Sequence, residues 1–226
     1  MSKPLPQRPP QPRVQRLLMH PLAKPAVFLA LLAPLALLVW GAVADTLGAN
    51  PAEALVRGLG DWTLRVLCLG LAVTPLRTLT GWHALARLRR MLGLFSAFYM
   101  ALHFLAYAWF DKGLLWGDIV LDIAKRPFIL VGSAAGLLML PLAATSFNRA
   151  VKALGGARWQ ALHRSVYAIA GLGLLHFFWM RAAKHRFGEV AVYAAVIGVL
   201  LGWRLWRRLA ARARAPAIPA ASLGKP

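Results

Sequence analysis

The chain contains six stretches of about twenty predominantly apolar residues, and they limit its fold more than any other feature. An α-helix of that length crosses the hydrocarbon core of a bilayer, which is roughly 30 Å thick. Lipid offers backbone amides no partner, so each spanning segment must satisfy its own hydrogen bonds, and the alternation typical of barrel strands is absent. We therefore expect transmembrane helices at residues 26–44, 62–79, 91–110, 128–147, 162–180 and 190–206.

Composition favours one membrane domain. Hydrophobic residues make up 59% of the 226 residues and charged residues only 15%, which is not the balance of a soluble domain. We expect an all-α integral membrane protein with a flexible, basic, proline-rich segment at 1–25, a six-helix transmembrane domain at 26–206 and a basic tail at 207–226. Cys68 is the only cysteine, which excludes an intrachain disulfide and a dithiol redox pair.

The charges indicate how the helices cross the membrane. The net charge of +20 would suggest nucleic acid in a soluble protein, but here most of the 27 cations cluster on alternate connections. The positive-inside rule then predicts that both termini are cytoplasmic, and all seven acidic residues fall at or near the outer side. Attraction to anionic lipid of the inner leaflet explains the charge excess without a nucleic acid partner.

Two histidines inside the expected helices are the leading site residues. His103 lies thirteen residues after Arg90 in the third span, and His176 lies twelve residues after Arg164 in the fifth. Both helices run outward, so at about 1.5 Å per residue the two imidazoles reach nearly the same depth. Two neutral imidazoles on separate helices can bind the opposite faces of a heme iron. The pair therefore predicts a b-type heme in the outer half of the membrane.

Roles without a cofactor stay open for these histidines. His103 could be an interior residue bonded to a carbonyl or hydroxyl, such as that of Tyr99 or Tyr107, because single polar groups in spans often only join helices. A transporter or channel could use the same histidines as a relay. A membrane assembly factor would need no cofactor either, and both classes would be colourless.

His163 stands at the start of the fifth span, about 20 Å from His176 along a helix axis and near the inner surface. On an ideal helix the two side chains point about 140° apart, so a second cofactor would need a bend in the helix. We leave a heme-ligand role and an interfacial role open for His163.

Two segments carry a resemblance to a known family: RRMLGLFSAFYMALHF at 89–104 and RWQALHRSVYAIAGLGLLHFFW at 158–179. GANPAEAL, TPLR and KRPFILVG, which begin at Gly48, Thr74 and Lys125, extend it across the spans. The chain resembles the MsrQ or YedZ-type heme-binding membrane subunits of the bacterial periplasmic methionine sulfoxide reductase system. That family is similar to the transmembrane domain of ferric reductases and NADPH oxidases.

The resemblance implies that His103 and His176 are axial ligands of an outer heme. In the wider family a second histidine precedes the first by about fourteen residues, and here that position is Arg89. A complete second heme at His163 is therefore doubtful. We interpret Arg89 and Arg90 as a candidate site for the phosphate of a flavin such as flavin mononucleotide (FMN), since guanidinium groups bind phosphate in a bidentate manner. Positive-inside anchoring accounts for the same arginines without a ligand.

The resemblance also implies a function in the bacterial inner membrane. Electrons would pass from a cytoplasmic flavin reductase or quinol to a periplasmic molybdopterin-containing reductase that repairs oxidised methionines. The chain would be an electron-transfer component rather than the catalytic subunit. A ferric reductase-like or other cytochrome b carrier is the alternative. Residues 111–126, with their acids and Trp116, are the candidate docking segment or a solvated connector.

Overall fold

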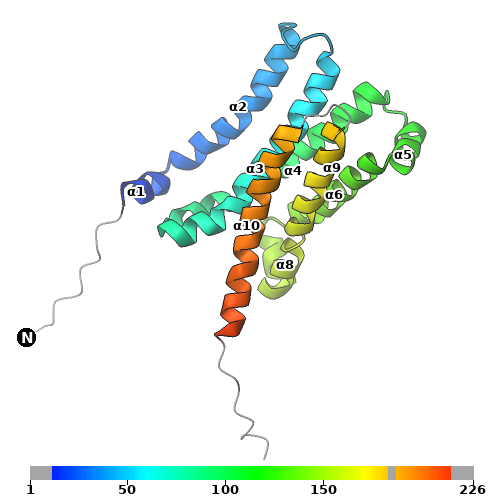
Figure 1. Ribbon diagram of the computed structural model, residues 1–226. Helices are drawn as coiled ribbons and strands as arrows, with labels where there is room; N and C mark the ends of the chain where they lie inside the picture. Colours follow the sequence, from blue (N-terminus) through cyan, green and yellow to red (C-terminus); the bar gives the residue numbers. More distant parts are fainter. Residues whose placement is uncertain (1–11, 183–186, 215–226) are drawn as a thin grey trace, which may run out of the picture.

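The computed structural model describes residues 12–182 and 187–214, and over these ranges the chain is helical, with no strand (Figure 1). In chain order the helices are α1 (Arg13–Met19), α2 (Ala23–Val43), α3 (Pro51–Thr80), the 3-10 helix η1 (His83–Leu88), α4 (Arg89–Ala106), the π-helix η2 (Tyr107–Asp111), α5 (Trp116–Lys125), α6 (Pro127–Ala144), α7 (Asn148–Leu154), α8 (Gly156–His163), α9 (Val166–Ala182) and α10 (Phe187–Ala213).

Five helical segments of the described chain are long and apolar enough to cross a membrane. They are α2, α3, the continuous segment His83–Asp111, α6 and α10, and they coincide with five of the expected spans. The remaining expected span, 162–180, coincides with α9, which has 17 residues. The all-helical class predicted from the sequence is therefore confirmed for the described residues, and five of the expected spans coincide with helices that could cross a membrane.

Local capping makes α3 differ from its hydropathy-based boundaries. α3 begins at Pro51 rather than near residue 62, because the Asn50 side chain accepts the backbone N–H of Glu53 at 3.0 Å and proline suits the first helical position. α3 ends where Gly81 adopts a left-handed conformation with φ of 73°. Residues 13–19, within the segment expected to be flexible, form α1, whereas residues 1–11 and 215–226 lie outside the described residues.

Two helix pairs form the centre of the bundle. α3 packs along α4, α6 packs along α9, and α10 covers α9. One core cluster joins α3, α6, α9 and α10, and a second joins α2, α3, η1 and α4. Figure 1 shows α1, α8 and the end of α10 toward one end of the bundle, with α5 and the α2–α3 turn toward the other. The first and last described helices therefore reach the same end.

Candidate heme site

The structure brings His103 and His176 together. His103 comes from α4 and His176 from α9, and their ring centroids lie 6.2 Å apart with the ring planes at 73°. Both side chains are partly buried. The matched depth expected from the sequence is thus observed as a direct pairing of the two imidazoles.

Each imidazole bonds to the backbone of a further helix. Nδ1 of His103 lies 2.8 Å from the carbonyl oxygen of Val56 on α3, and Nδ1 of His176 lies 2.6 Å from that of Phe128 on α6. A carbonyl only accepts, so Nδ1 must carry the proton in both rings and Nε2 carries the lone pair. This is the tautomer that binds a metal through Nε2 while a second partner holds Nδ1.

The two tyrosines considered as partners of His103 bond elsewhere. The Tyr99 hydroxyl donates to the carbonyl of Leu31 at 2.7 Å, and the Tyr107 hydroxyl donates to Asp122 at 2.6 Å. A carbonyl does bond His103, as an interior structural histidine would require, but it occupies only Nδ1. The bond therefore does not engage Nε2.

The distance between the rings fits one metal ion between them. Metal–imidazole bonds measure about 2.0–2.1 Å, and the centre of an imidazole ring lies about 1.2 Å behind each ring atom, given bonds of about 1.3–1.4 Å. Two imidazoles bound in line to one metal ion would place their centroids about 6.4 Å apart. The observed 6.2 Å is close to that value. Donor type, tautomer and spacing all fit two histidines that would hold one heme iron between them.

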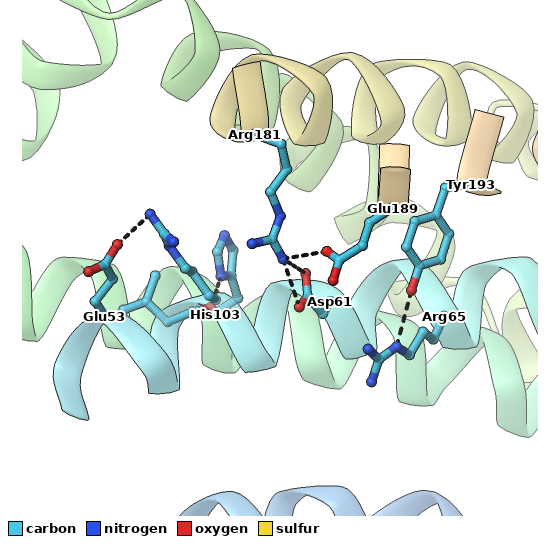
Figure 2. Close-up of polar contacts among 9 residues, drawn as sticks. Glu53, Asp61, Arg65, His103, Arg181, Glu189 and Tyr193 are labelled. Atoms are coloured by element: carbon cyan, nitrogen blue, oxygen red, sulfur yellow. Dashed lines mark hydrogen bonds and ion pairs between the residues drawn. The ribbon is translucent and has the colours of Figure 1, made fainter. Parts of the chain in front are cut away.

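A partly buried ionic cluster that sequence reasoning missed lies beside this pair (Figure 2). Arg181 reaches from the end of α9 to Asp61 on α3, with N–O distances of 3.2 and 3.3 Å, and to Glu189 on α10 at 3.0 Å (Figure 2). Its guanidinium also lies over the Phe177 ring, 5.0 Å from the centroid. Arg181 lies one residue beyond the expected span 162–180, and only the packing of α9 against α3 and α10 reveals its partners.

His163 lies in a separate site, at the end of the bundle that contains α8 (Figure 1). The expected fifth span is not one continuous helix: α8 ends at His163, and α9 begins at Val166 after a two-residue turn. The His163 ring stacks on Trp159 with centroids 3.9 Å apart, and Nε2 lies 3.1 Å from the Thr145 hydroxyl. The indole N–H of Trp159 in turn donates to the Thr145 carbonyl at 2.9 Å, so this tryptophan belongs to the site. His83 is exposed at the start of η1.

A cavity of about 320 Å³ adjoins His163. Arg89, Arg90 and Arg204 line it, together with Trp159 and Tyr167. Arg204 comes from α10 and bonds the Leu71 carbonyl of α3, a contribution that its position in the last span did not indicate. The two arginines singled out from the sequence therefore do share a concave site with His163, within the usual range for small-molecule pockets of roughly 300–1,000 Å³.

The candidate docking segment at 111–126 contains a helix, α5. α5 and the turn before it form an open groove of about 520 Å³, lined by Asp111, Lys112, Asp118, Asp122 and Lys125 among others. Trp116, at the start of α5, is 72% exposed. Burial alone would raise the pKa of Asp122, yet hydrogen bonds from Arg126, Tyr107 and Lys112 lower this pKa to about 2.

Comparison with known families identifies the class of this bundle. Residues 59–174 match the family described as ferric reductase like transmembrane component, and this range includes His103 on α4. His176 lies two residues beyond the matched range. Together with the apolar helices, the match makes the chain a multi-pass membrane protein with a ferric reductase-like transmembrane domain. A comparison with solved structures gives no significant match.

The relatives narrow the class further. The protein-methionine-sulfoxide reductase heme-binding subunit MsrQ of Polaromonas naphthalenivorans is 63% identical over 196 residues, which cover 87% of this chain and 90% of that protein. The MsrQ subunit of Ralstonia nicotianae is 56% identical over 181 residues (80% and 83%), and that of Bordetella pertussis is 52% identical over 188 residues (82% and 91%). The chain belongs to the MsrQ family.

Proposed function

We propose that this chain is an electron-transfer subunit that holds one b-type heme between His103 and His176 and serves a methionine sulfoxide reductase. The observation that carries the proposal is the pairing of two imidazoles at 6.2 Å, each with Nδ1 held by a backbone carbonyl. The names of the relatives, which are heme-binding subunits, support the cofactor and the partner system.

The residues of the site have separate roles in this proposal. A bound heme supplies one-electron transfer through its iron. His103 and His176 would hold the heme iron through Nε2, and the carbonyls of Val56 and Phe128 fix the orientation of the rings and raise their basicity. The apolar helices around the pair exclude water. The chain therefore acts as a relay and not as the subunit that reduces methionine sulfoxide.

We place the chain in a bacterial inner membrane with six spans, α9 being the fifth, and with both termini in the cytoplasm. A helix of 17 residues is at the short end of the spanning range. The end of the bundle that contains α1, α8 and the end of α10 has most of the described arginines, which supports a cytoplasmic orientation. The opposite end, with α5, then faces the periplasm.

Electrons enter, in this proposal, at the cytoplasmic end from a flavin reductase or a membrane quinol. They leave at the periplasmic end toward a molybdopterin-containing reductase, and the groove along α5 is the docking surface. The exposed Trp116 and the mixed charges of the groove support that choice, because interfaces favour aromatic anchors within a polar rim.

An absorbance spectrum tests the heme proposal. The purified chain should show a Soret band and, after reduction with dithionite, the sharp α and β bands of a low-spin b-type heme, with one heme per chain by pyridine hemochrome assay. His103→Ala and His176→Ala should each abolish these bands, whereas His20→Ala, at an exposed turn, should retain them. A colourless wild-type chain would support a transporter or assembly factor, and intact bands in both ligand variants would refute the assignment.

The inner cavity is proposed as the FMN site. Arg89 and Arg90 engage the phosphate and Arg204 adds a third cation, while His163 borders the cavity. FMN fluorescence quenching should show weaker binding to the Arg89→Ala/Arg90→Ala variant. The matched control is Arg149→Ala/Lys152→Ala, which removes two exposed cations of α7 that do not line the cavity. Equal FMN affinity in both variants would eliminate this site and would leave the arginines as membrane anchors.

A further inference from the structure

The two paired histidines are seated on their neighbouring helices in the same way. A Cβ atom placed on Gly60 of α3 would lie 3.0 Å from Cε1 and 3.1 Å from Nδ1 of His103. A Cβ atom on Gly132 of α6 would lie 2.7 Å from Nδ1 and 2.8 Å from Cε1 of His176. Each ring therefore presents the same edge to a glycine on a different helix.

The glycines stand in a fixed relation to the carbonyls that bond the rings. Val56 and Gly60 are four residues apart on α3, and Phe128 and Gly132 are four residues apart on α6. In an α-helix the carbonyl of residue i accepts the N–H of residue i+4 and retains a second lone pair. Because Cα–Cβ bonds tilt toward the helix N-terminus, a side chain at i+4 leans over that carbonyl. Glycine at i+4 leaves the lone pair open to an imidazole.

We propose that Gly60 and Gly132 are positioning residues that seat the two histidines, so that each donates its Nδ1 proton to a helix carbonyl and presents Nε2 to the heme iron. The sequence pattern of Gly132 and Gly136 is typical of close helix packing. Gly136 fits that description, since its Cβ would meet the Sδ atom of Met100 at 3.2 Å. Gly132 has the additional role of giving the ring access to the Phe128 carbonyl. The effect on heme rests on the proposed function.

Alanine at these positions should displace the rings to different degrees. The contact at 132 is shorter than any ordinary Cβ contact, and the ring that it meets is a rigid plane, so Gly132→Ala must move His176. At position 60 the added Cβ would lie 3.0 Å from the His103 ring, which must therefore move less than the His176 ring, so Gly60→Ala is the milder variant. Alanine favours a helix over glycine, so helix propensity gives no reason for either variant to unfold.

Heme content, the electron paramagnetic resonance spectrum and the midpoint potential are measured for Gly60→Ala, Gly132→Ala and two controls. The controls are Gly171→Ala on α9 and Gly198→Ala on α10, where an added Cβ would meet nothing within 4 Å. Gly132→Ala should lose heme or, where heme is kept, shift the low-spin signals and raise the midpoint potential. Loss of the Nδ1 hydrogen bond makes the ligand less basic and favours the reduced iron. Gly60→Ala should change in the same direction by less.

Two results would overturn the proposal: wild-type spectra and potential in Gly132→Ala, or equal losses in the controls. Nitrogen-15 NMR of the heme-free chain with labelled histidines separates this inference from the heme proposal, because the chemical shifts report which ring nitrogen carries the proton. His176 in the wild-type chain should be protonated at Nδ1, and Gly132→Ala should remove that preference. A colourless wild-type chain with the expected tautomer would refute the heme proposal alone. A wild-type His176 without that tautomer would refute the seating.

Discussion

Replacing Arg181 with methionine should destabilise the bundle by leaving a buried carboxylate without its partner. The Arg181 side chain is 11% exposed and that of Asp61 is 21% exposed, so both charges lie mostly out of water. Methionine keeps much of the side-chain volume and removes the charge. Breaking a buried ion pair from one side typically costs about 3–5 kcal/mol, because the remaining charge stays desolvated.

The structure places this variant near the lower end of that range. Asp61 keeps some contact with solvent, and the second partner, Glu189, has a side chain that is 59% exposed and can hydrate freely. We therefore expect a loss of about 3 kcal/mol in the free energy of unfolding, which lowers the ratio of folded to unfolded chain by roughly a hundredfold. Glu189→Gln removes only the exposed contact and should cost about 0–1 kcal/mol.

Denaturant titration in detergent micelles, followed by tryptophan fluorescence and circular dichroism, measures these differences. The double variant Asp61→Asn/Arg181→Met removes both buried charges and should recover most of the stability lost in Arg181→Met, since no unpaired carboxylate then remains at position 61. Two outcomes would refute the reasoning. Arg181→Met could prove as stable as Glu189→Gln, or the separate stability losses of Arg181→Met and Asp61→Asn could simply add in the double variant.

Three further predictions concern other parts of the molecule. Interactions of the Asp122 carboxylate lower its pKa to about 2 from an ordinary 3.8, so they stabilise the chain above about pH 4 and are lost as the pH falls toward 2; acid titration by fluorescence should show a transition in the wild type that Asp122→Asn lacks. Tyr99→Phe leaves the Leu31 carbonyl without its 2.7 Å donor and should cost about 1 kcal/mol by denaturation, more than Tyr193→Phe, whose hydroxyl bonds the exposed Arg65. Trp159→Phe keeps a ring on His163 but loses the N–H bond to Thr145, so the free energy of unfolding should fall by about 1 kcal/mol while FMN titration shows affinity within a few-fold of wild type.

The membrane helices could be predicted from the sequence because the thickness of the hydrocarbon core alone requires about twenty consecutive apolar residues, whatever the helix packs against. Their boundaries could not, because they depend on local chemistry. Asn50 caps α3 well before the apolar stretch begins. The polar stretch at 111–126 contains α5, whose buried Ile119 packs in a cluster with Tyr107 and Ile129, and this packing stabilises a helix that hydropathy alone does not reveal.

The candidate site divides in a similar way. His103 and His176 could be identified because two polar rings at equal depth on parallel helices must lie at one level of a bundle. Their partners could not, because the acceptors are backbone atoms 47 and 48 residues away and carry no side-chain signature. The contacts of Arg204 and Arg181 could not be predicted for a related reason. Each lies at or near the end of an expected span, where a cation commonly anchors a helix. Its actual partners depend on which helix packs beside it.

The cluster at Arg181 and the glycine seats should affect the midpoint potential of a heme between the histidines in opposite directions. Asp61 directly follows Gly60 on α3, and Arg181 lies over Phe177, the residue after His176, so the cluster is close to both rings. Arg181→Met removes a positive charge in a low-dielectric region, which favours the oxidised, more positive iron and should lower the potential. Gly132→Ala weakens a ligand hydrogen bond and should raise it. Potentiometric titration of the two variants and their combination distinguishes the causes, because independent effects of opposite sign should largely cancel in the double variant. A lowered potential in both single variants would contradict this account of the seats, and a raised potential in Arg181→Met would contradict the electrostatic role of the cluster.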